Sequence, residues 1–261
     1  MYSAKCPVLK NGKGILQWTF VCAIVEKTER MMFMKKWIAM LLVLVMVLSL
    51  AACGKEAPAG KVEAAPETTE TADAGKPVTL GRIEGGVYTN DYIGIGCELD
   101  STWTFYTAEE LQELPNQVGE LMQDTEYADA HLRQITDMMA ENVDAMVNMN
   151  VQYTKLTLQE RLAYLKMNDE ALVDMILEDR DSMAAAYAQA GIEDAILEKT
   201  TVNFLGQERC AIRTVATIQG YPYYMLQVFE YGLGQYGVTI TFSSFFEDNT
   251  TSMLDLFYAL D

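Results

Sequence analysis

Histidine, proline and positive charge are all scarce in this chain, and each scarcity argues against a class of function. The 261 residues include one His, 6 Pro and 19 Lys and Arg against 37 Asp and Glu, which gives a net charge of −18. With a single His, His-based metal cages and most acid–base sites that depend on an imidazole are not expected. A nucleic-acid partner is not expected either, because a phosphate backbone requires a basic face. The hydrophobic fraction of 50% excludes a disordered chain.

Residues 34–53, MKKWIAMLLVLVMVLSLAAC, have the layout of a secretory signal, with two lysines followed by an apolar run. The end of this segment, Leu50-Ala51-Ala52-Cys53, resembles the lipobox of bacterial lipoproteins. In that family the cysteine thiol is acylated with diacylglycerol, and the chain is cut just before it. The resemblance implies that 34–52 is a signal peptide and that Cys53 is the lipidated first residue. The alternative is a transmembrane anchor, for which the apolar run is short.

The segments on either side of this signal are not expected to fold. Residues 1–33 precede the charged start of the signal, so we expect translation to begin at Met31, Met32 or Met34, or 1–33 to be a long leader. Residues 53–80 are rich in Ala, Pro, Gly, Thr and Glu, which predicts a flexible acidic tether. The lipid anchor would then hold the protein on the extracytoplasmic face of the cytoplasmic membrane, in a Gram-positive-like cell.

The charge of the mature chain sharpens this expectation. Seven of the Lys and Arg and two of the Asp and Glu precede Cys53, which leaves 12 basic and 35 acidic residues and a net charge of −23. Such a body is repelled by an anionic membrane surface, so the lipid rather than charge would hold it there. Two acyl chains suffice for stable anchoring.

Residues 81–261 have the length of one domain, and their pattern predicts an α+β fold with about six strands in a mainly antiparallel sheet flanked by helices. Short Gly-containing turns separate the last four long strands, which predicts an antiparallel meander. Asn168 is the expected cap of one helix, and Gly191 its expected end region. Strands are expected at 92–99, 145–156, 196–204, 209–218, 223–231 and 236–242, and helices at 107–122, 126–142, 157–190 and 249–260.

Two stretches resemble PsbP-like domains. The opening YTNDYIGIGCELDSTWTF is similar to the turn, strand and Trp corner that begin that fold, and the chain from 196 to 260 is similar to its ending of long hairpins and a helix. Ser101 and Thr102 stand where many members have a Pro-containing turn. The resemblance implies an α/β/α sandwich around an antiparallel sheet. It implies no active site, because the family shares none, and its members mostly bind or assemble with partners.

Few residues suggest chemistry. Cys97 and Cys210 both fall on expected strands and are either buried free cysteines or a disulfide. His131 is expected on a helix surface, no metal motif or cofactor motif is present, and the acidic runs fit solvated helix faces. Tyrosine is favoured at interfaces because it offers a large contact area with little entropy to lose. A possible binding surface therefore consists of Tyr221, Tyr223, Tyr224, Tyr231 and Tyr236, with a buried sheet face as the alternative.

These features favour a lipid-anchored extracytoplasmic binding or assembly module without catalysis. Its expected partners are the membrane, through the lipid on Cys53, and a protein of the envelope. Two alternatives stay open. An envelope-associated hydrolase would bring two acids together in a pocket, at least one with a raised pKa. A small solute-binding protein would need a cleft, and such proteins usually have two lobes.

Overall fold

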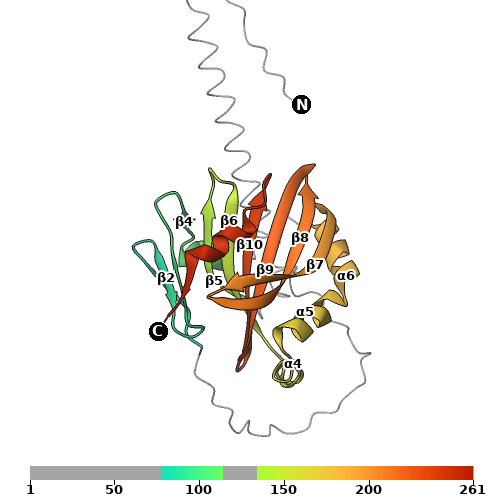
Figure 1. Ribbon diagram of the computed structural model, residues 1–261. Coiled ribbons are helices and arrows are strands. Elements are labelled where there is room, and N and C mark those ends of the chain that lie inside the picture. The colour runs from blue at the N-terminus through green and yellow to red at the C-terminus, as the bar shows by residue number, and fades with distance from the viewer. Residues whose placement is uncertain (1–77, 114–133, 261) are drawn as a thin grey trace, which may run out of the picture. The chain divides into compact units, whose positions relative to one another are not determined.

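Two antiparallel sheets carry the fold of the described residues, 78–113 and 134–260 of a computed structural model (Figure 1). Within these residues the smaller sheet has the order β1-β2-β3-β11 and the larger has the order β4-β5-β6-β10-β9-β8-β7. The strands are β1 (Arg82–Glu84), β2 (Val87–Asn90), β3 (Ile95–Glu98), β4 (Thr104–Phe105), β5 (Gln134–Asn142), β6 (Val147–Lys155), β7 (Ile192–Phe204), β8 (Gln207–Ile218), β9 (Tyr221–Leu233), β10 (Tyr236–Phe245) and β11 (Phe257–Ala259).

Three helices lie in the sequence between β6 and β7, and a short helix and a 3₁₀ turn follow β10. They are α4 (Leu158–Tyr164), α5 (Asp169–Leu177), α6 (Arg180–Gln189), α7 (Thr250–Met253) and the 3₁₀ turn η2 (Leu254–Leu256). Residues 108–113 are also helical, and Thr107 caps them in a reciprocal exchange with Glu110. In the same way, Thr157 and Glu160 form a capping box at the start of α4.

The central strands of the larger sheet are buried on both faces. One face packs against the smaller sheet and α7, in a core that includes Leu226 and Val228 of β9. The alternate residues Tyr223 and Met225 are also buried and lie on the other face, where α5 and α6 cover β7 and β8. Burial on both faces explains why β9 reads as a nearly continuous apolar run.

The meander expected from the sequence is confirmed. Strands β7 to β10 follow one another in the sheet, and each pairs antiparallel with the next. Leu205-Gly206 and Gln219-Gly220 form the first two turns, and all four residues have φ between 53° and 80°. Two consecutive positive φ values are typical of the type I′ hairpin turn, whose twist matches that of the flanking strands.

Two predicted helices are wrong. Residues 134–142, the described part of the helix expected at 126–142, form β5. A register shift between Thr136 and Met138 and burial of both faces remove the alternation that identifies a strand. Residues 249–260 form only α7 and η2 before Phe257–Ala259 pairs with β3 as β11. The sheet is therefore not one of about six strands, because β3 belongs to the smaller sheet and the larger sheet gains β4 and β5.

The helical region after β6 agrees better with the sequence, and its cap offers a test. Asn168 Oδ1 accepts a hydrogen bond of 2.8 Å from the Ala171 amide at the start of α5. Replacing Asn168 by alanine is expected to lower the free energy of unfolding by about 1 kcal/mol, the usual cost of losing such a cap. Urea unfolding measures this loss. Gln159→Ala on α4, which removes no cap, should change the same free energy by less than about 0.5 kcal/mol.

Several expectations lie outside the described residues. These are the leader, the signal peptide, Cys53, the tether up to residue 77, the helix expected beyond residue 113, and His131. Across the described part of the chain, no helix is both long enough and apolar enough to cross a membrane.

Candidate functional site

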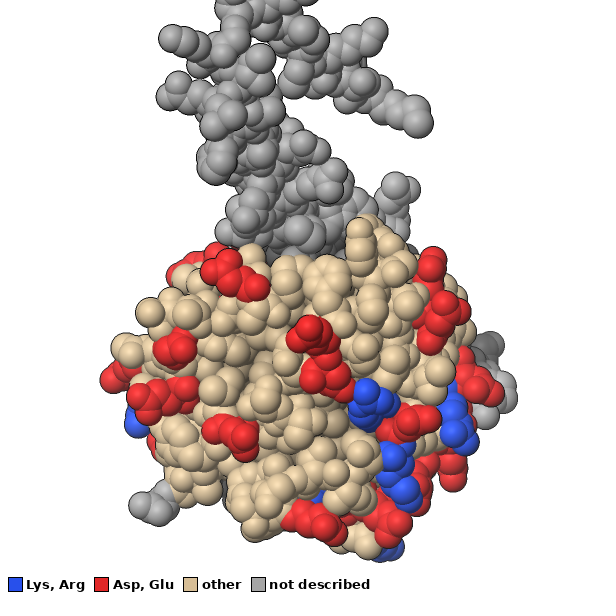
Figure 2. Space-filling view, turned by 45° about the horizontal axis from the view of Figure 1, so that its top comes forward, with Lys and Arg blue, Asp and Glu red and all other residues tan. Residues whose placement is uncertain are grey.

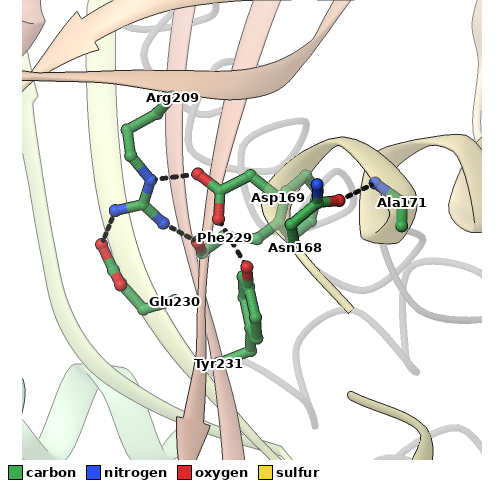
Figure 3. A network of polar contacts seen from close by, with 7 residues as sticks. All are labelled: Asn168, Asp169, Ala171, Arg209, Phe229, Glu230 and Tyr231. Carbon is green, nitrogen blue, oxygen red and sulfur yellow. Dashed lines mark hydrogen bonds and ion pairs between the residues drawn. The ribbon is translucent and has the colours of Figure 1, made fainter. Parts of the chain in front are cut away.

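Arg209 on β8 stands at the centre of a polar network that ties α5 to the larger sheet (Figure 3). Its Nε donates to Asp169 Oδ2, its Nη1 donates to Glu230 Oε1 at 2.5 Å, and its Nη2 donates to the Phe229 carbonyl at 2.6 Å. The hydroxyl of Tyr231 donates to the other oxygen of Asp169 at 2.7 Å. One guanidinium thus joins a helix to two neighbouring strands.

These groups meet because Asp169 lies at the start of α5, while Glu230 and Tyr231 lie near the end of β9. Asp169 is the first residue of α5, directly after the capping Asn168, where a carboxylate also suits the helix dipole. Burial by itself lowers the pKa of Arg209, but the hydrogen bonds to Glu230 and Asp169 outweigh it and leave the pKa above its ordinary value. Burial and donation to Asp169 raise the pKa of Tyr231 to about 12. Both groups therefore keep their protons at neutral pH.

A hollow of about 310 Å³ lies beside this network. Arg209 is the one basic residue that lines the hollow, and the charged neighbours of Arg209 in Figure 3, Asp169 and Glu230, are both acids. An anionic ligand would therefore meet net negative charge. On the face that Figure 2 shows, acidic side chains are scattered, and most of the basic ones lie towards one side. Within the described residues, no group of three or more His, Cys, Asp and Glu side chains could hold a metal ion. The hollow is lined by Asn168, Asp169, Glu170, Thr201, Glu208, Arg209, Cys210 and Tyr231.

A second polar cluster is buried between the two sheets, around Asp137 of β5. Its Oδ2 accepts hydrogen bonds of 2.6 Å from the Tyr88 hydroxyl and 2.6 Å from Asn90 Nδ2, and its Oδ1 accepts one of 2.8 Å from the Gly81 amide. Asn90 Nδ2 also donates to the Tyr153 hydroxyl at 2.8 Å. Burial raises the pKa of Asp137, although these three donors act in the opposite direction. Asp137 accepts hydrogen bonds from a phenol, a side-chain amide and a backbone N–H, so the cluster links the two sheets.

The tyrosines expected to form one surface are in fact dispersed. Tyr221 is exposed, whereas Tyr223 is buried and donates to Ser243 Oγ at 2.9 Å. Tyr224 lies under the Arg213 guanidinium, 5.8 Å from the ring centre, and Tyr231 belongs to the Arg209 network. Tyr236 packs at 6.1 Å from the Tyr153 ring. The reason is the strand period, which sends successive side chains to opposite faces, and the length of β9, which separates its two ends.

The two cysteines do not pair. Cys97 on β3 and Cys210 on β8 are both free, and they lie on different sheets. The Cys97 sulfur is 3.9 Å from the sulfur of Met149, and burial raises the pKa of this thiol to about 12. Burial also raises the pKa of Cys210, and the nearby Glu170 adds to the shift. Both thiols are therefore poor nucleophiles at neutral pH.

The exposed Tyr221 has an aromatic neighbour that the sequence did not suggest. Its ring lies edge to face with Phe246, at a centroid distance of 5.4 Å, and the two side chains are 55% and 43% exposed. The Phe246 amide donates to the Pro222 carbonyl, so the end of β10 remains attached to the start of β9. Phe246 has φ of +66°, a left-handed conformation that is unfavourable for a bulky residue. The two rings form an apolar patch at this end of the larger sheet, which we call the Tyr221–Phe246 patch.

Sequence reasoning missed the central residues of both clusters. Asp137 falls within the helix predicted at 126–142, and a lone acid among apolar residues gives no sign that it is buried. Arg209 follows a hairpin turn, and its partners lie 40, 20 and 21 residues away in the sequence. A usable signal was composition, because an arginine within a strand of so acidic a chain is expected to find carboxylates.

Comparison with known proteins assigns no family. No protein-family model matches the chain. The search of curated proteins also gave no match.

Proposed function

We propose that this chain is a lipid-anchored extracytoplasmic domain that binds a protein partner in the bacterial envelope and catalyses no reaction. The anchoring rests on the sequence that ends Leu50-Ala51-Ala52-Cys53, after its basic start and apolar run. The acidic body supports the same role, because a protein with a net charge of −23 needs a covalent lipid to stay at an anionic surface.

A role in binding rather than chemistry is supported by how the buried polar groups are used. The carboxylates of Asp169 and Glu230 are bound to Arg209, which also donates to a backbone carbonyl. Asp137 accepts from three donors on the smaller sheet and the segment before it. These contacts hold helix to sheet and sheet to sheet, and they leave neither cluster arranged as a nucleophile with a base.

The observation that carries the binding role is the Tyr221–Phe246 patch. Large exposed aromatic side chains are enriched where proteins bind one another. A bulky residue with a positive φ is costly to the fold, and such strain is found preferentially at functional positions. Phe246 combines both features, since it is exposed, aromatic and left-handed. Binding of a partner to these two rings would explain why the strained backbone of Phe246 is retained.

The Phe246→Gly variant separates binding from stability. Glycine adopts a positive φ without penalty, so the loss of the ring contacts is partly offset, and the free energy of unfolding should stay within about 1 kcal/mol of the wild type. A photo-crosslinking amino acid at Tyr221, in cells, is expected to yield a specific adduct with an envelope protein. The Phe246→Gly substitution should reduce that adduct at least tenfold.

The matched control is Gln219→Gly, which relieves a similar φ of 53° in the neighbouring turn but removes no ring. This variant should keep the adduct at wild-type yield. A Cys53→Ala form should leave the membrane fraction and lose the adduct as well. An adduct that survives Phe246→Gly would show that this patch is not the binding surface.

We also propose a PsbP-like relationship at the level of the fold. The opening hairpin of β2 and β3 and the four-strand meander support it, as does the helical turn that follows the last long strand. The small second sheet goes beyond the three-layer arrangement that the resemblance implies.

A further inference from the structure

The outward face of α4 and its C-cap residue Leu165 form a stripe of leucines. Leu158, Leu162 and Leu165 follow one another at helical spacing and are 63%, 52% and 68% exposed. No residue of α4 is buried, yet the Thr157–Glu160 capping box fixes where the helix begins. A capped helix that turns three leucines outward has its apolar face reversed relative to an ordinary surface helix. Such a face indicates a contact with something apolar outside the domain.

The charge around α4 indicates what that contact is. Between residues 155 and 166 the chain carries Lys155, Arg161 and Lys166 and a single acid, Glu160, whereas acids outnumber basic residues almost three to one in the chain after Cys53. Lys155 and Lys166 are exposed. Leucines flanked by basic side chains are typical of a helix that lies in the interface of an anionic bilayer. A protein partner of this acidic domain would not require leucines that are flanked by basic side chains.

The strand register places α4 at the end of the domain where the tether arrives. The Gly81 amide donates to Asp137, which lies in β5 between residues that pair with Gln152 and Val151 of β6. From there β6 continues only to Lys155 before α4 begins, a distance of about 10 Å at 3.3 Å per residue. In Figure 1, α4 lies at the lower end of the larger sheet, beside the β9–β10 turn. The Leu156 amide donates to the Gln235 carbonyl of that turn.

The tether can bring this end to the bilayer. The composition of the residues between Cys53 and Val78 predicts a flexible tether, for which the expected end-to-end distance is about 25 to 30 Å. The Tyr221–Phe246 patch lies at the opposite end of β9 and β10, about 30 Å away along the strands. An anchor near α4 therefore leaves the patch facing away from the membrane.

We infer that α4 lies in the headgroup region of an anionic bilayer, with Leu158, Leu162 and Leu165 towards the acyl chains and Lys155 and Lys166 near lipid phosphates. This inference rests on the proposed lipid anchor at Cys53. It adds a second contact, which orients the domain and makes the membrane surface a direct ligand of the folded part.

Quenching by brominated lipids tests the contact. The full lipoprotein carrying Leu162→Trp is reconstituted in vesicles of phosphatidylcholine and phosphatidylglycerol with bromine on the acyl chains, and the emission of the wild-type protein is subtracted. We expect at least a twofold loss of the added tryptophan's emission. Ile196→Trp, at an exposed apolar position on β7, is the matched control and should keep its emission. Quenching of Leu162→Trp no greater than that of the control overturns the inference.

A charge variant and a lipid label separate this inference from the proposed anchor. Adding Lys155→Glu and Lys166→Glu to Leu162→Trp should at least halve the quenching, while incorporation of a labelled fatty acid at Cys53 stays unchanged. Quenching that is unchanged in this variant overturns the role of the basic residues. If Cys53 is labelled and Leu162→Trp is not quenched, only the contact through α4 fails. If a Cys53→Ser form is labelled as strongly as the wild type, the anchor itself fails.

Discussion

Replacing Asp137 by alanine is expected to lower the free energy of unfolding by about 3 kcal/mol. The substitution removes the acceptor of the buried Tyr88 hydroxyl, one of the acceptors of Asn90 Nδ2 and the acceptor of the partly buried Gly81 amide, and each orphaned buried donor costs about 1 to 3 kcal/mol. The sum is reduced because the cost of burying the carboxylate disappears with it. Urea unfolding gives the difference, and Glu84→Ala, at an exposed position on β1, is the control.

The same carboxyl gives the protein a pH dependence whose sign is defined. Burial raises the pKa of Asp137 above its ordinary value, so the folded state binds this proton more tightly than the unfolded state does. The stabilisation from the proton is complete below the ordinary pKa of 3.8 and is lost as the pH rises through the raised value. Each unit of pKa difference corresponds to about 1.4 kcal/mol.

An Asp137→Asn variant isolates this contribution, because it lacks the titrating group and keeps a similar shape. The difference in unfolding free energy between this variant and the wild type should shift in the variant's favour as the pH rises from about 3.5, in the window that the raised pKa defines. A difference that stays constant with pH would mean that Asp137 is not buried in its charged form.

Replacing Phe242 by alanine is expected to cost about 3 to 5 kcal/mol, the usual range for a buried aromatic residue. Phe242 of β10 is fully buried, and its ring lies 6.4 Å from that of Phe204 and 5.6 Å from that of Phe257. Phe257 belongs to β11, so this ring connects the larger sheet to the strand that closes the smaller one. The cavity left behind therefore weakens both the core and the attachment of the C-terminal segment.

Hydrogen exchange distinguishes this local effect from general destabilisation. In Phe242→Ala, the amides of β11 and of its partner β3 should lose more protection than those of β7 and β8. Phe246→Ala, which removes an exposed ring from the same end of the chain, should leave the exchange of β11 unchanged. Equal loss of protection in all strands would contradict the role assigned to the three rings.

The meander could be predicted from the sequence because its signals are local. Leu205-Gly206 and Gln219-Gly220 sit between long β-branched and aromatic runs, and both turns have the positive φ values that glycine permits. The cap at Asn168 was predictable for the same reason, since the acceptor and its donor are three residues apart. In each case the residues that decide the structure lie close together in the chain.

The errors arose where distant partners decide the structure. Met138 and Met139 occur at positions that also suit a helix, and only their pairing with β6 makes them part of a strand. Phe257 and Leu260 complete a helical pattern, but the free edge of β3 takes the segment as a strand. For the candidate sites, Tyr221 belongs to the tyrosines predicted as a possible binding surface and is exposed, whereas Phe246 is exposed without any sequence pattern that indicates it.

The long strands of the meander also set the distance between the two ends of the domain. β9 and β10 separate the α4 end of the domain from the Tyr221–Phe246 patch, and their length fixes how high that patch stands above α4. An insertion of one residue that no β-bulge absorbs would turn every later side chain of the strand to the opposite face, exchanging Tyr223 with Tyr224. The height can therefore change only in steps of two residues, about 6 to 7 Å, and only if the neighbouring strands lengthen together. The alternation of side chains along the strands therefore restricts which changes in strand length this domain can accept.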